Sequence, residues 1–299
     1  MIVAGIDAGH HGRVLRNLLR TASAIALAAT ATGVSLAVTA QPAQAVAGIV
    51  YVNAISAHDS TTPKTVTAIC PGGTAAIGGA ARITGATGDV TIRAMRPARL
   101  APFGIYYYGA TAEEDPDGFA GSWSLEITGV CVPTPGGLEY VSASGTDPAL
   151  LWVTSSCGTK RVIGSGYTVT ATAAVKASGV QIDSNRAYLS VEPSRVAGAV
   201  TPFTGTITAV CANAAYPDQE MVSVDTAQDS FDGKTAAARC PSGKQIIGVG
   251  AGLIRFRNHT VIDDFWLTSS TNTATVTGYE DQAGNPDIWA ATAYALCAA

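Results

Sequence analysis

Short runs in which apolar and polar residues alternate recur along the chain, at 66–70, 90–94, 125–130 and 207–210. A period of two places successive side chains on opposite faces of an extended strand. Gly, Pro, Asn and Asp separate these runs at intervals of about ten residues, as they do in proteins built from short strands. Beyond residue 45, no stretch has the apolar period and capping residues of an amphipathic helix. The pattern therefore predicts an all-β protein.

The first 45 residues have a different pattern, which is typical of a secretory signal. Three arginines precede an uncharged, alanine-rich run over 21–40, and the small residues Ala43 and Ala45 form an A-x-A cleavage site. We expect cleavage after Ala45, so that 1–45 is a signal peptide and the mature protein is secreted, with no stable membrane insertion. A membrane anchor is the alternative, because the run is nearly long enough to span a bilayer.

All six cysteines follow this segment: Cys70, Cys131, Cys157, Cys211, Cys240 and Cys297. An even number of cysteines without a C-x-x-C motif, in an exported chain, indicates disulfides rather than a metal site or a redox-active pair. An aromatic residue stands eight positions before every second cysteine, at Trp123, Phe203 and Trp289. Three repeats are therefore predicted, over 46–135, 136–215 and 216–299.

This internal symmetry favours disulfides within each repeat, Cys70–Cys131, Cys157–Cys211 and Cys240–Cys297. Each would close a loop of about 55–60 residues, for which chain entropy contributes roughly 4 kcal/mol. The alternative pairing joins neighbouring repeats, Cys131 with Cys157 and Cys211 with Cys240, and leaves the outermost two cysteines to close a ring.

Three like units suggest closure around a pseudo-threefold axis. We expect a β-prism-like arrangement, with one sheet of four or five strands per repeat and a core that includes Ile92, Ile182, Ile262 and the three repeated aromatics. Three small β-sandwiches in tandem are the alternative. The glycine pairs after each first cysteine, at 78–79, 164–166 and 248–250, lead into strands rather than helices. They are therefore interpreted as bulges or close backbone contacts near the axis, not as phosphate loops.

The motif Lys-Thr-x-x-Ala-x-Cys-Pro-x-Gly, followed later by Trp-x7-Cys, resembles a group of secreted actinobacterial triple-repeat proteins of unknown function. The resemblance covers the whole mature chain, and the motif is complete in repeats one and three. The middle repeat lacks the Pro after Cys157 and the upstream Lys. A more distant similarity is to the vitelline membrane outer layer proteins, whose β-prism repeats also open with Cys-Pro-x-Gly. These resemblances imply a fold, not a function.

Acidic loops are the first candidate sites for a ligand. Glu114 and Asp115 stand 17 and 16 residues before Cys131, and Glu280 and Asp281 stand at the same distances before Cys297. A glycine follows each Glu-Asp pair in register, at Gly118 and Gly284, and Asp117 and Asp287 add further charge. Carboxylates beside a tight turn can bind the hydroxyls of a sugar or Ca²⁺. A solvated hairpin tip is the alternative.

Aromatic residues near the acids are the second candidates. These are Tyr106, Tyr107 and Tyr108 in repeat one and Trp266 in repeat three. Rings stack on the apolar face of a pyranose, although strands also favour tyrosine for packing alone. Since side chains alternate between faces, three consecutive tyrosines cannot all point into the core. Asp59 before Lys64 and Asp229 before Lys234 are expected to stabilise turns.

Composition changes the picture in two ways. Charged residues make up only 13% of the chain, and no basic cluster is present, which argues against nucleic acid as a partner. Loss of 1–45 would leave 15 basic and 21 acidic side chains, a net charge of −6. No catalytic motif, metal or cofactor is indicated. We therefore expect a secreted, non-enzymatic protein with lectin-like recognition of a glycan or cell-envelope component. A structural or protein-interaction role is the alternative, and a wall or glycan hydrolase is a further one.

Overall fold

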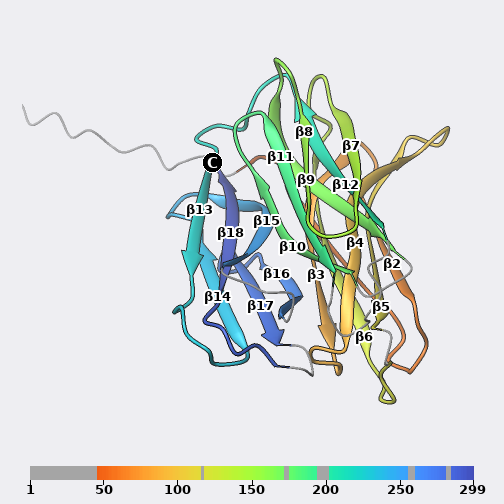
Figure 1. Ribbon diagram of the computed structural model, residues 1–299. Coiled ribbons are helices and arrows are strands. Elements are labelled where there is room, and N and C mark those ends of the chain that lie inside the picture. Colours follow the sequence, from red (N-terminus) through yellow and green to blue (C-terminus); the bar gives the residue numbers. More distant parts are fainter. Residues whose placement is uncertain (1–45, 116–117, 172–174, 194–201, 255–259, 281–283) are drawn as a thin grey trace, which may run out of the picture. The chain divides into compact units, whose positions relative to one another are not determined.

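A computed structural model describes residues 46–115, 118–171, 175–193, 202–254, 260–280 and 284–299 (Figure 1). The predicted signal peptide, 1–45, lies outside the described residues. The protein is all-β, as predicted from the alternating pattern. Among the described residues, none belongs to a helix long and apolar enough to cross a bilayer.

The described residues form six strands in each predicted repeat. In repeat one these are β1 (Val50–Ile55), β2 (Lys64–Ile69), β3 (Thr74–Thr84), β4 (Val90–Leu100), β5 (Ile105–Glu114) and β6 (Ser124–Pro133). In repeat two they are β7 (Glu139–Asp147), β8 (Leu151–Ser156), β9 (Arg161–Thr170), β10 (Val175–Ile182), β11 (Arg186–Pro193) and β12 (Phe203–Ala212). In repeat three they are β13 (Glu220–Asp225), β14 (Lys234–Arg239), β15 (Gln245–Ile254), β16 (Thr260–Thr268), β17 (Thr273–Glu280) and β18 (Ala290–Ala298).

The strands build three six-stranded sheets, and every sheet is shared by two repeats. The orders are β1-β6-β3-β16-β17-β14, β13-β18-β15-β10-β11-β8 and β2-β5-β4-β9-β12-β7. At each junction the third strand of one repeat pairs with the fourth strand of another, so the three junctions link the repeats in a closed cycle. The expected assignment of one sheet to each repeat is therefore wrong. The repeats are not separate tandem sandwiches either, because each sheet continues from one repeat into the next.

Each repeat contributes two three-stranded halves that pack on one another, and a disulfide joins them. The first cysteine directly follows the second strand, and the second cysteine lies in the sixth strand. The bonds are Cys70–Cys131, Cys157–Cys211 and Cys240–Cys297, which confirms the pairing within repeats. Their loops span 61, 54 and 57 residues, so each bridge restricts a long stretch of the unfolded chain. Three disulfides are typical of a protein that resides in an oxidising compartment.

The glycines after each first cysteine lie at β-bulges close to a neighbouring repeat. The strand register shifts just before Gly78, Gly164 and Gly248. A Cβ atom added to Gly164 would stand 1.7 Å from the backbone oxygen of Ile77, and one added to Gly78 would stand 2.7 Å from that of Ile247. Only glycine allows two backbones to approach so closely. The interpretation of these glycines as bulges and close contacts is confirmed.

One continuous apolar core runs through all three repeats. Trp123, Phe203 and Trp289 are almost wholly buried in it, as are Ile92 and Ile262. The remaining predicted core residue, Ile182, is only partly buried and packs at the margin. Alternating inward residues on both halves of each repeat supply this core, which is the packing expected of a two-layer β protein.

Candidate functional site

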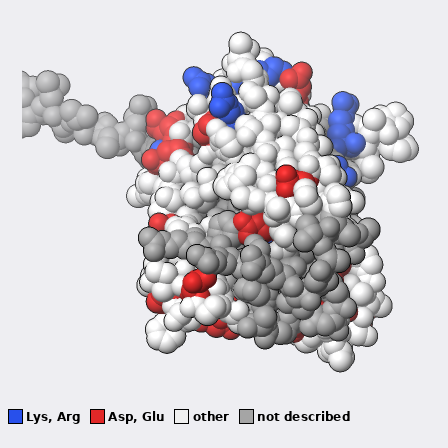
Figure 2. Space-filling view, viewed as in Figure 1, with Lys and Arg blue, Asp and Glu red and all other residues white. Residues whose placement is uncertain are grey.

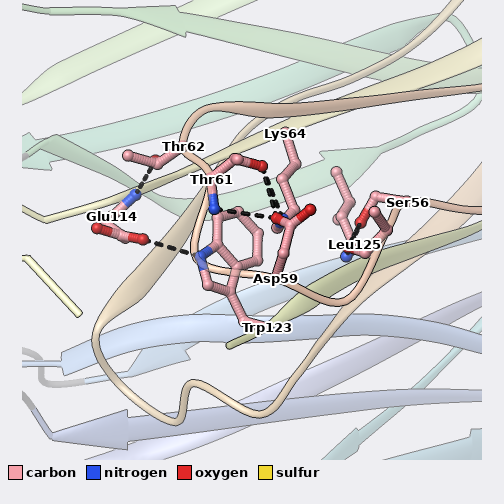
Figure 3. Close-up of polar contacts among 9 residues, drawn as sticks. Ser56, Asp59, Thr61, Thr62, Lys64, Glu114, Trp123 and Leu125 are labelled. Carbon is pink, nitrogen blue, oxygen red and sulfur yellow. Dashed lines mark hydrogen bonds and ion pairs between the residues drawn. The ribbon is translucent and has the colours of Figure 1, made fainter. Parts of the chain in front are cut away.

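Glu114, the first acid of the predicted loop in repeat one, lies beside Trp123, which is buried directly before β6 (Figure 3). The Trp123 Nε1–H group donates a hydrogen bond to Glu114 Oε1 at 2.9 Å. Glu114 Oε2 accepts a second bond from the Phe119 amide at 3.2 Å. Lys64 Nζ lies 4.8 Å from the centre of the indole and forms an ion pair with Asp59. Both carboxylate oxygens of Glu114 therefore have partners within the protein.

Lys64 occupies an inward position of β2, and its side chain is only 3% exposed. A buried ammonium group requires a counter-charge, and Asp59 supplies it. The hydrogen bond from Lys64 holds the pKa of the Asp59 carboxyl well below its usual range. The indole face adds a cation–π contact. Together with the β-bridge between Asp59 and Trp123, these contacts fasten the β1–β2 loop to the start of β6.

Repeat three contains the same arrangement. The Trp289 Nε1–H group donates to Glu280 Oε1 at 2.9 Å, and Glu280 Oε2 accepts from the Asn285 amide at 2.8 Å. Lys234 Nζ lies 5.0 Å from the centre of the Trp289 ring and pairs with Asp229, whose pKa it lowers. The expected turn-forming role of the Asp residue is confirmed in both repeats, since Asp59 and Asp229 each accept a bond from a loop amide two residues ahead.

The middle repeat shows why these residues occur as a set. Phe203 stands at the position of the two tryptophans, and it has no N–H group that requires an acceptor. Leu151 replaces the buried lysine, and Ser194, outside the described residues, replaces the glutamate. Loss of the indole N–H thus accompanies loss of both charges. This comparison indicates that Glu114 and Glu280 serve to hold the indoles.

Of the four other predicted acids, the structure describes Asp115 and Asp287. Asp115 and Asp287 are half-buried, and their backbone amides donate to Asp89 O at 3.0 Å and to Asn285 Oδ1 at 3.1 Å. Asp117 and Asp281 lie outside the described residues. Glu114 and Glu280 end strands of different sheets, and each has its own tryptophan. Among the described residues, no group of three or more His, Cys, Asp or Glu side chains is placed to hold a metal ion.

The three consecutive tyrosines divide between the core and the surface. Tyr108 is buried, and this burial raises the pKa of its phenol. Tyr106 and Tyr107 are half-buried; the ring of Tyr106 contacts Tyr140 edge-on with 6.2 Å between ring centres. The guanidinium of Arg99 lies 5.4 Å from the centre of the Tyr106 ring. Of these three tyrosines, Tyr106 and Tyr107 are therefore partly accessible to a ligand, and Tyr108 is not.

Trp266, the remaining predicted aromatic, is half-buried on β16. The guanidinium of Arg82 covers its ring at 4.0 Å. Arg82 is itself held by Glu126, whose Oε2 accepts from Nε at 2.8 Å and from Nη2 at 2.6 Å. One face of the indole is thus occupied by an arginine of another repeat, so a sugar could stack on this ring only from the opposite side.

A group of buried charges on two neighbouring sheets was not predicted from the sequence. Lys176 and Glu192 are opposite one another on β10 and β11, and Asp263 on β16 accepts a hydrogen bond from the Gly88 amide at 2.8 Å. Desolvation raises the pKa of Glu192 to about 7 and holds that of Asp263 well above its usual range, while Lys176 opposes both shifts. Charged residues inside strand patterns of a charge-poor chain are the signal that could have revealed this group.

An exposed aromatic face on repeat two was also missed. Trp152 projects outward from the edge strand β8 and is 65% exposed. In the β8–β11 register, Trp152 is opposite Ser190, and Thr154 is opposite Tyr188. The two rings are therefore diagonal neighbours on one face of the sheet, a separation of about 7–8 Å. A single residue between a buried Leu and a buried Val gave the signal, since the alternation assigns Trp152 to the outer face.

A carboxylate and a guanidinium lie at the end of this face. The Tyr188 hydroxyl donates to the carboxylate of Asp183, which also accepts the amides of Asn185 and Arg186 at 2.9 and 2.8 Å. Arg186 is exposed and two residues from Tyr188, so its side chain points to the same side of β11. We call Trp152, Thr154, Tyr188, Asp183 and Arg186 the Trp152 face.

Comparison with known proteins adds no relative, since no family model matches the chain and no curated protein matches it significantly. The resemblance to the triple-repeat group and to the vitelline membrane proteins therefore stays a prediction.

Proposed function

We propose that the mature chain is a secreted, non-enzymatic protein that binds a glycan of the cell exterior through the Trp152 face. The exposure of Trp152 carries this proposal, because a large ring that lies free on the outer face of a sheet contributes nothing to the core. An aromatic ring offers an apolar platform for the C–H groups of a sugar ring. Thr154, Tyr188 and Arg186 supply hydroxyl and guanidinium groups for the sugar hydroxyls, and Asp183 orients the Tyr188 hydroxyl.

The proposed binding site lies on repeat two, whereas the sequence pointed to the acidic loops of repeats one and three. In the acidic loops, Glu114 and Glu280 bond to buried indoles, so their oxygens are less available to a ligand. The hydrolase alternative has less support for the same reason, since it needs two carboxylates that act on one bond.

The test is a glycan array and a polysaccharide pull-down with the chain 46–299, followed by titration of the sugars that bind. Trp152→Ala should weaken binding roughly tenfold or more, as truncation of a central aromatic contact does. Phe231→Ala is the matched control, because Phe231 is 78% exposed in the loop between β13 and β14, on another repeat, and its loss should leave binding unchanged. Absence of binding to every glycan, or equal binding by Trp152→Ala and the parent chain, would refute the proposal.

A further inference from the structure

The β4–β5 hairpin departs from the symmetry of the three repeats. The fourth strand of each repeat has a bulge, at Arg93 in β4, Ser178 in β10 and Asp263 in β16. Beyond this bulge, β4 is two residues longer than β16 and three residues longer than β10. The hairpin extends away from its sheet at the right of Figure 1. The pairing of the repeats does not require this extension, because the shorter hairpins make the same junctions.

The tip of this hairpin is apolar, whereas its counterparts are polar. Leu100 and Ile105 pair across the strands, and Phe103 at the turn is 76% exposed. Ile69, at the end of neighbouring β2, is also exposed. The equivalent turns over 183–185 and 269–272 contain only Asp, Ser, Thr and Asn. Exposed Leu, Ile and Phe at the tip of a projecting hairpin indicate contact with an apolar phase.

Positive charge follows directly behind the tip. Arg96 and Arg99 are exposed on β4, and the stretch 94–112 contains no acidic residue. Figure 2 shows the same protrusion with a white end and blue atoms at its base, without red. Tyr106 and Tyr107 lie on β5 beside these arginines. A protein segment that inserts into a bilayer places apolar side chains at the acyl chains, and amphipathic rings and cations at the headgroups. The hairpin presents its side chains in this order from the tip.

A lipid surface fits this hairpin better than a protein partner does. A stable protein interface buries roughly 1,200–2,000 Å² of accessible surface in total, and a turn of four residues with its flanking strands offers far less surface than that. Shallow insertion into a membrane needs only a few apolar side chains together with attraction to anionic headgroups. The rest of the mature chain carries a net negative charge, so an anionic surface would attract this end and repel the remainder.

We propose that the β4–β5 hairpin inserts its tip reversibly into the surface of a membrane that contains anionic lipids. Leu100, Phe103 and Ile105 enter the boundary between headgroups and acyl chains, and Arg96 and Arg99 contact lipid phosphates. The contact is peripheral, and it would hold the Trp152 face, on another repeat, close to the cell surface.

The test is co-sedimentation of the chain 46–299 with vesicles of phosphatidylcholine alone and with added phosphatidylglycerol. Binding should be stronger to the anionic vesicles and should fall in high salt. Leu100→Ser with Phe103→Ser should lower the partition coefficient at least tenfold, because the apolar contribution is lost. Arg96→Gln with Arg99→Gln should lower binding to anionic vesicles at least tenfold and leave the weak binding to neutral vesicles unchanged.

Phe231→Ser is the matched control, since this phenylalanine is as exposed as Phe103 but lies elsewhere; it should bind as the parent chain does. In Phe103→Trp, the added indole should show a blue shift of its emission on anionic vesicles and be quenched by brominated lipids. No sedimentation of the parent chain, no blue shift, or equal loss in Phe231→Ser would overturn the proposal. So would self-association without lipid that the tip variant abolishes, because the hairpin would then contact a second copy.

Discussion

Replacement of Gly164 by alanine should force apart strands β3 and β9, which belong to repeats one and two and pack closely on one another. The added Cβ would stand 1.7 Å from the backbone oxygen of Ile77 and 2.8 Å from its carbonyl carbon. These are backbone atoms of a central strand, so no side chain can rotate to relieve the contact. The strands β3 and β9 must move apart by more than an ångström, which disturbs the core on both sides.

The magnitude follows from this geometry. Overpacking of a core costs about 1–3 kcal/mol, and more where the backbone must shift. We expect Gly164→Ala to lower the free energy of unfolding by at least about 3 kcal/mol. For a chain of this size, 1 kcal/mol corresponds to roughly 2–4 °C in the melting temperature, so the transition should fall by about 6–12 °C.

Two further glycines provide a graded series. Gly78→Ala places its Cβ 2.7 Å from the oxygen of Ile247 and should have an intermediate effect. Gly72 has open space around its Cβ position and no positive φ, so Gly72→Ala should be neutral or stabilise the protein by about 0.4–1 kcal/mol. Thermal and urea unfolding followed by circular dichroism, without reductant, measures all three. If Gly164→Ala unfolded within about 1 kcal/mol of Gly72→Ala, the close contact between repeats would be refuted.

Three other predictions concern the braced tryptophans, the buried charges and the disulfides. Glu114→Ala leaves the buried Trp123 N–H without an acceptor and should lower the free energy of unfolding by about 1–3 kcal/mol, with Glu280→Ala equivalent in urea titrations; equal stability to the parent chain would contradict the bracing role. Glu192 has a folded pKa of about 7, above its unfolded value, so it binds its proton more tightly when folded. Stability should therefore fall as the pH rises from about 4.5 to 7, and Glu192→Gln should flatten this part of the profile, whereas an unchanged slope would assign it to other groups. Non-reducing peptide maps should contain only disulfides within repeats, and reduction should cost roughly 4 kcal/mol per bridge; any peptide that joins Cys131 to Cys157 would contradict the fold.

Much of the architecture was predictable because it repeats along the chain. Cysteine and aromatic spacing defined three units and the disulfide pairing, since equivalent positions in a repeat have equivalent surroundings. The period of two predicted strands and which side chains face inward. The glycine pairs predicted bulges, because a position that recurs as glycine in three copies points to a backbone constraint rather than to a ligand.

The candidate site was predicted less well, and the acidic loops show why. From their spacing alone, two carboxylates beside a turn indicate a ligand site. The position of Trp123 nine residues after Glu114 gave no sign that the indole N–H turns back onto that carboxylate. Comparison of the repeats contained the signal, because Lys, Glu and Trp are all replaced in repeat two. The buried lysine was hidden for the same reason, since charge alone suggests a solvated position.

Taken by itself, the sequence determined the class of fold, the three repeats, the disulfides and the face of each strand, all of which depend on local pattern or on internal repetition. Only the tertiary structure decided which strands share a sheet, which acids turn inward, and where Trp152 and the β4–β5 hairpin meet solvent. The physical reason is that a strand pattern specifies an inner and an outer face but not the neighbouring strand. Edge pairing is made by backbone groups that every residue carries, and partners distant in the chain are chosen by packing across the whole core.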